Sequence, residues 1–95
     1  MAINILLPYQ LKQQIARQAR QKRLEKNISR STLWEKSGVP VSTLKHFETT
    51  GNISLDALLR IALVLDSLNE FSQLFVLGAP VSLYEKKTVR QRGRK

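Results

Sequence analysis

The chain has 95 residues, of which 42% are hydrophobic, and this is enough for one folded domain with its own core. It contains no cysteine, which excludes a disulfide framework and a thiolate metal site and is compatible with a reducing cytoplasm. The formal net charge is +9, from 16 basic and 7 acidic residues, so the protein is expected to attract a polyanion such as nucleic acid or an anionic membrane.

The basic residues are concentrated in two parts of the chain. Seven lie between Lys12 and Arg30, and six lie in the last ten residues. No apolar stretch is long enough to cross a bilayer, and the N-terminus has no basic region that would indicate a signal peptide. We therefore expect a folded domain over residues 8–77 and a basic tail over residues 78–95. In that tail, residues 81–84 are expected to form a short strand or an extended chain, and the residues from 86 onward are expected to be disordered.

Helical periodicity predicts a first helix that begins at Pro8 and fades at residues 25–27. A proline is suitable in the first turn because its missing N–H would have no helical partner there. The residues expected to face the core are Leu11, Ile15, Ala19 and Leu24.

A second, short helix is predicted after residue 28. Ser29 suits its N-cap because a serine side chain accepts a hydrogen bond from a first-turn amide, and Gly38 suits the position after its last turn. Leu33 and Trp34 are expected to face inward.

The third helix is expected to run from about Val41 to Thr49. Pro40 cannot easily continue the second helix, but it favours the first turn of the next one. Leu44 and Phe47 are the residues of this helix that we expect to be buried.

Two further helices are predicted after the loop at residues 51 and 52. Ser54 suits the N-cap of a fourth helix from Leu55 to Leu65, which is apolar on more than one side and is therefore expected to be the most buried element. A fifth helix is expected from about Leu68 to Leu77, before the Gly-Ala-Pro sequence. Its apolar face would consist of Leu68, Phe71, Leu74 and Phe75.

The segment from Ile28 to Glu48 reads I-S-R-S-T-L-W-E-K-S-G-V-P-V-S-T-L-K-H-F-E, and Gly51 follows three places later. It predicts two short helices joined by a tight turn, an arrangement in which the second helix can enter the major groove of DNA. The segment resembles the Cro/phage-repressor (XRE) family of helix-turn-helix regulators, whose pattern is L-S-Q-x-x-L-A-x-x-x-G-V-S-x-x-T-I-x-x-x-E-x-G. The resemblance covers about Pro8 to Phe75 and implies an all-α, five-helix Cro/repressor-like domain that binds an operator in double-stranded DNA.

The third helix is expected to carry the residues that read DNA. Val41, Ser42, Lys45 and His46 are spaced to share one exposed face, so we predict contacts with base edges, such as Lys45 with guanine and Val41 with a thymine methyl group. An ordinary solvated helix face is the alternative interpretation. His46 is the only histidine, so no metal site is expected.

Three residues depart from the family pattern: Arg30 replaces a glutamine, Trp34 replaces a small alanine, and Pro40 replaces a capping serine. The resemblance also implies an ion pair between Arg23 and Glu48 with a structural role. The predicted contacts with the DNA backbone are those of Arg30, Thr43, Lys22 and Lys26.

Helix-turn-helix proteins usually bind paired half-sites, so a homodimer is expected, formed through the C-terminal part of the chain. The P-x-Q-L sequence at residues 8–11, and the F-E pair before a loop and a Leu-rich helix, also resemble the HipB-type antitoxins. This narrower resemblance implies repression of the protein's own operon and a HipA-like kinase toxin as partner, in the bacterial cytoplasm at the nucleoid. The alternative is a stand-alone regulator of the phage-repressor type. The residues of the expected dimer interface are Phe71, Leu74, Phe75, Leu83 and Tyr84.

Other function classes are less consistent with the sequence. A membrane-surface peptide would need the apolar stripe of the first helix, which the core requires. An enzyme is not expected because the chain has no glycine-rich phosphate loop, metal cluster or nucleophile–base pair, and no cofactor is implied. The tail at residues 86–95 is a second DNA contact, a partner-binding arm or solubilising charge.

Overall fold

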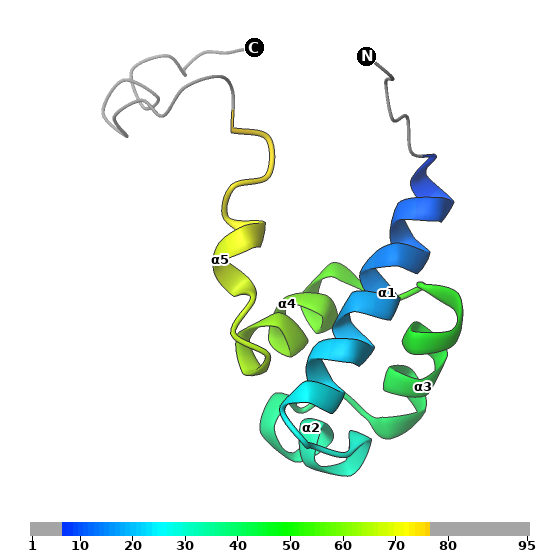
Figure 1. The fold of residues 1–95 in the computed structure, drawn as a ribbon, viewed down its shortest axis with the longest axis vertical. Coiled ribbons are helices and arrows are strands. Elements are labelled where there is room, and N and C mark those ends of the chain that lie inside the picture. Colours follow the sequence, from blue (N-terminus) through cyan, green and yellow to red (C-terminus); the bar gives the residue numbers. More distant parts are fainter. Residues whose placement is uncertain (1–6, 77–95) are drawn as a thin grey trace.

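The computed structural model describes residues 7–76 (Figure 1). These residues form five helices and contain no strand. The predicted all-α, five-helix architecture is therefore confirmed for the described residues. The predicted tail, with its strand at residues 81–84 and the interface residues Leu83 and Tyr84, lies outside the described residues. The helices are α1 (Pro8–Glu25), α2 (Arg30–Ser37), α3 (Val41–Thr50), α4 (Leu55–Val64) and α5 (Leu68–Phe71).

The long helix α1 organises the bundle. It packs against α3, while α2 contacts both α3 and α4, and α4 contacts α5. Figure 1 shows α2 and α3 beside the C-terminal half of α1, with its N-terminal turns extending past them. The core is formed by buried apolar residues from every element except α5: Ala16, Leu33, Val39, Leu44, Phe47, Ile61, Ala62 and Leu65.

The helix boundaries follow local signals in the sequence. Ser29 caps α2, since its hydroxyl accepts a 3.1 Å hydrogen bond from the Thr32 amide, and Ser54 caps α4 in the same way. Gly38 ends α2 in the left-handed conformation, with φ +79°. Pro40 precedes α3 without a side-chain cap, as its replacement of serine predicts.

The predicted inward faces of α1 and α2 are partly wrong. Ile15 and Ala19 do pack against the core, but Leu11 and Leu24 are exposed. The fully buried residues of α1 are Ala16 and Arg23. In α2 only Leu33 is buried. Trp34 is 47% exposed because it lies about 100° further around a helix of two turns, whose single inward side Leu33 already occupies.

Helix α4 buries as many residues as α3, two of its ten, although its composition predicts the most buried element. Only Ile61 and Ala62 are buried within it, followed by Leu65 just after its end, whereas Leu55 and Leu63 are largely exposed. It packs mainly against α2 and α5 and lines a groove with α1, and Leu55 and Leu63 lie outside these contacts. The helix therefore has more apolar residues than this small bundle buries.

The fifth helix is shorter than the predicted span to Leu77. α5 ends at Phe71, and the following amides donate to carbonyl groups three residues earlier, which is the pattern of tight turns. The Ser72 hydroxyl assists by donating to the Asn69 carbonyl. Phe75 has φ +67° and is 97% exposed, so the predicted apolar face does not continue to it.

Gly51 allows the end of α3 to touch α1. Its φ is +85°, and a Cβ atom added there would lie 2.8 Å from the carbonyl carbon of Lys12, which is backbone and unable to give way. At Gly38, with φ +79°, an added Cβ atom would meet only the flexible side chain of Arg60, at 3.4 Å. Both glycines permit a left-handed turn, but only Gly51 also permits a close helix contact.

We expect Gly51→Ala to destabilise the fold more than Gly38→Ala. The left-handed conformation costs roughly 1–2 kcal/mol for alanine at either position, and the backbone collision with Lys12 adds to it only at Gly51. Urea unfolding followed by circular dichroism measures both losses. Equal losses in the two variants would show that the contact with α1 contributes nothing.

Candidate nucleic-acid interface

Helices α2 and α3 are held at a fixed angle by the apolar residues between them. Leu33, Leu44 and Phe47 are each at most 2% exposed. Val39 is buried in the turn between the two helices. The Val39 amide donates a 3.1 Å hydrogen bond to the Ser37 hydroxyl, so this turn is closed by its own side chains. The result is a rigid helix-turn-helix unit, and a rigid unit is what presenting side chains to a groove requires.

The outer side of α3 carries the residues predicted to contact bases. Ser42, Lys45 and His46 are exposed, whereas Val41 is half-buried. Thr43, predicted to contact a phosphate, is also half-buried. Ser42, Lys45 and His46 project from the side of α3 opposite to the buried Leu44 and Phe47, and Val41 and Thr43 lie on its flanks.

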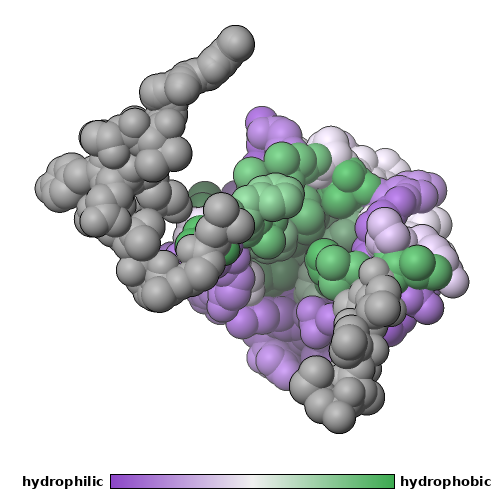
Figure 2. All heavy atoms as spheres, turned by 90° about the horizontal axis from the view of Figure 1, so that it is seen from above, coloured by the Kyte–Doolittle hydropathy of each residue, from purple (hydrophilic) through white to green (hydrophobic). Residues whose placement is uncertain are grey.

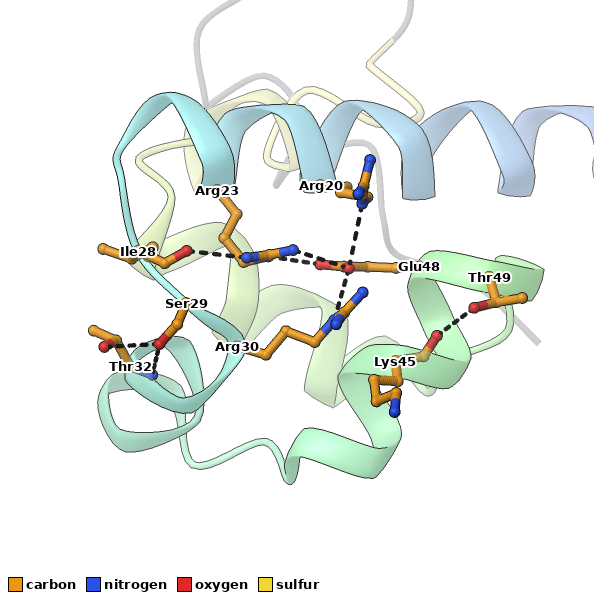
Figure 3. Close-up of polar contacts among 9 residues, drawn as sticks. All are labelled: Arg20, Arg23, Ile28, Ser29, Arg30, Thr32, Lys45, Glu48 and Thr49. Carbon is orange, nitrogen blue, oxygen red and sulfur yellow. Dashed lines mark hydrogen bonds and ion pairs between the residues drawn. The ribbon is translucent and has the colours of Figure 1, made fainter.

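Glu48 joins α3 to three arginine side chains (Figure 3). Its side chain is only 5% exposed. Arg23 binds it at two points, with Nε 2.8 Å from Oε2 and Nη2 3.2 Å from Oε1. The Nε atom of Arg30 lies 3.0 Å from Oε1, and that of Arg20 lies 3.9 Å from the same oxygen. The pairing of Arg23 with Glu48 is thus present in the structure, within a larger cluster.

Arg23 also fastens the loop that precedes α2. Its Nη1 donates a 3.0 Å hydrogen bond to the carbonyl group of Ile28. A single buried guanidinium therefore connects α1, the loop before α2, and α3. Because burying a charge is costly without a partner, this geometry favours one relative placement of the three segments.

The predicted contacts with the DNA backbone fall in different places. Arg30 lies at the start of α2, beside α3, with its side chain 35% exposed. Lys22 lines a groove between α1, α4 and α5, away from this unit. Lys26 forms an ion pair with Asp66, after α4, and that contact lowers the pKa of the Asp66 carboxyl. Arg30 and Thr43 are therefore grouped with the α3 face, and Lys22 and Lys26 are not.

Arg20 is a residue that the sequence interpretation did not select. Its place near Glu48 agrees with the geometry of α1, because residues 20 and 23 are three apart and lie on the same side of the helix. That spacing is the signal that identifies a second arginine near Glu48. Among residues 7–76 there is no group of three metal-ligating side chains, and no helix there is long and apolar enough to span a membrane.

We expect Glu48→Ala to lower stability by about 3–5 kcal/mol, because it leaves the Arg23 guanidinium buried without its carboxylate. The double variant Arg23→Met/Glu48→Leu removes both charges and is expected to regain more than half of that loss. Urea unfolding of the wild type, Arg23→Met, Glu48→Leu and the double variant completes the cycle. A double variant as unstable as the sum of the two single variants would contradict a coupled pair.

Comparison with known families identifies the class of protein. A family model described as Helix-turn-helix (HTH_3) matches residues 20–71, which is more than half of the chain and includes α2, α3 and the Glu48 cluster. Comparisons with curated proteins and with solved structures gave no match. The matched family consists of DNA-binding regulators and not of enzymes. The chain belongs to this helix-turn-helix family of Cro/repressor-type transcription regulators, which bind DNA.

Proposed function

We propose that the protein is a sequence-specific transcriptional repressor that reads an operator through α3 and represses its own operon. The observation that carries this proposal is the polar outer side of α3, where Ser42, Lys45 and His46 are exposed above a buried Leu44 and Phe47. Side chains of these types donate to and accept from base edges in the major groove. The net charge of +9 supplies the attraction to the phosphate backbone.

The neighbouring elements support the same orientation. Arg30 at the start of α2 has an exposed portion beside α3, and Thr43 lies in the first turn of α3. Both positions support the proposed backbone contacts. Val41 is half-buried, which leaves part of its side chain for an apolar contact such as a thymine methyl group. Lys22 and Lys26 are the weaker candidates, because they lie outside this group.

Binding to the DNA upstream of the protein's own gene tests the proposal. We expect tight binding to that DNA over a scrambled duplex, and a loss of at least about tenfold in the double variant Ser42→Ala/Lys45→Ala. Fluorescence anisotropy at several salt concentrations measures both. Lys12→Ala is the matched control, since this exposed lysine of α1 lies beside Gly51, at the C-terminal end of α3 and away from Ser42. Equal binding of both duplexes would refute sequence-specific reading.

A homodimer accompanies this proposal, because operator half-sites are arranged with two-fold symmetry. Its support is the apolar surface at the C-terminal end of the described chain, where Leu74 and Phe75 are exposed and Phe71 is half-buried. Figure 2 shows apolar side chains gathered at one end of the molecule, around a hollow in its surface. Exposed aromatic and aliphatic groups of this size favour association.

We expect the wild type to be dimeric at micromolar concentration and Leu74→Glu/Phe75→Glu to be monomeric, because a buried carboxylate without a partner disfavours the interface. Size-exclusion chromatography with light scattering measures both masses. Leu55→Glu is the control, since Leu55 is equally apolar and exposed but lies at the opposite end of α4 from α5. A monomeric wild type would refute the dimer.

An antitoxin role rests on the narrower sequence resemblance to HipB-type proteins. In that case the same domain, acting in the bacterial cytoplasm at the nucleoid, also binds a HipA-like kinase toxin. Co-purification of such a kinase with the chain, expressed from its natural operon, would separate this role from that of a stand-alone regulator. The tail at residues 78–95 is assigned no role in the proposal.

A further inference from the structure

The charges around Glu48 do not balance. Three guanidinium groups surround one carboxylate, and Arg23 alone binds both of its oxygens. Arg23 and Glu48 are both nearly excluded from solvent, so they neutralise each other as a buried pair. Arg20 and Arg30 therefore add two positive charges for which the described residues provide no further carboxylate.

The two additional arginines reach the same oxygen from different helices. Arg20 comes from α1 and Arg30 from α2, and Figure 3 shows them on opposite sides of Glu48. Each approaches Oε1 through its Nε atom, at 3.9 Å and 3.0 Å, so the two Nε atoms lie within about 7 Å of each other. Like charges held this close repel one another, and an anion placed between or above them relieves the repulsion.

The contacts with Glu48 leave the terminal N–H donors of Arg20 and Arg30 available. A guanidinium has five N–H donors, and Glu48 occupies only the Nε side of each of these two. The side chains of Arg20 and Arg30 are 54% and 35% exposed, so their terminal nitrogens have access to solvent. Paired terminal N–H groups match the oxygens of a phosphate in a bidentate contact.

We infer that Arg20 and Arg30 form a two-arginine phosphate site, oriented by Glu48, that binds phosphodiester groups of the DNA backbone. The site extends the DNA-binding surface from the start of α2 to α1, and Arg20 has no place in the contacts predicted from the sequence. Glu48 acts as a positioning residue, since it accepts a hydrogen bond from Arg30 Nε and lies 3.9 Å from Arg20 Nε. The inference rests on the DNA binding proposed above.

The number of phosphates bound is measured by the dependence of affinity on salt. Each neutralised phosphate contributes about 0.9 to the slope of log K against log salt concentration for duplex DNA. We expect Arg20→Gln and Arg30→Gln each to reduce the slope by about 1, and the double variant by about 2. Arg20→Lys keeps the charge and is expected to keep the slope while binding more weakly, because it lacks the bidentate fork.

The experiment uses the full chain and a mixed-sequence duplex. Fluorescence anisotropy measures the binding constant between about 50 and 200 mM salt. Arg17→Gln is the matched control: it removes the same charge one turn earlier on α1, from an exposed side chain without an ion pair among residues 7–76. Circular dichroism checks the fold of each variant, and Arg20 is exposed enough for its removal to leave the core intact.

The outcomes separate this inference from the proposed function. A slope reduced by Arg20→Gln and not by Arg17→Gln supports the site. An unchanged slope in Arg20→Gln, or an equal reduction in Arg17→Gln, would overturn it while DNA binding itself stands. A wild-type protein that binds no duplex would overturn both. Because the duplex has mixed sequence, failure to recognise the proposed operator does not affect the result.

Discussion

The buried contact between Arg23 and Glu48 is the constraint on which the orientation of α3 depends. Both charged groups are removed from water, and the cost of their desolvation is offset only when the guanidinium and the carboxylate meet in good geometry. The same guanidinium donates to the Ile28 carbonyl, so α1, the loop before α2 and α3 must all be in place together. Small relative movements of these segments would leave a buried charge with poorer partners.

A second contact fixes the C-terminal end of α3. At Gly51 the chain leaves the helix in a left-handed turn and lies so close to Lys12 that no side chain fits between them. Glu48 and Gly51 thus attach the C-terminal half of α3 to α1, while the apolar residues of α2 hold its N-terminal half. The exposed side of α3 is therefore presented by a helix with little freedom to tilt, which favours a defined placement of Lys45 and His46 in a groove.

The bundle buries less apolar surface than its composition offers. Leu63 on α4, Trp34 on α2 and Phe75 after α5 all remain substantially exposed. A small domain has a high ratio of surface to volume, and five short helices leave several sides uncovered. Such surfaces are expected where a protein associates with a second copy or another protein, and they lie on different elements from the polar side of α3.

The sequence by itself determined the number of helices, most of their boundaries and the helix-turn-helix class. These follow from local chemistry, since the caps at Ser29 and Ser54, the left-handed turn at Gly38 and the spacing of Leu44 and Phe47 act within a few residues. The Arg23–Glu48 pair came from the family resemblance alone. Which apolar residues of α1, α2 and α4 remain exposed was decided only in the tertiary structure. Burial depends on which neighbour a helix meets, so Leu24 and Trp34 are exposed although their apolar character suits a core. The gathering of Arg20 and Arg30 at Glu48 was decided there too, because it joins residues of three helices and no short-range pattern records the distances between them.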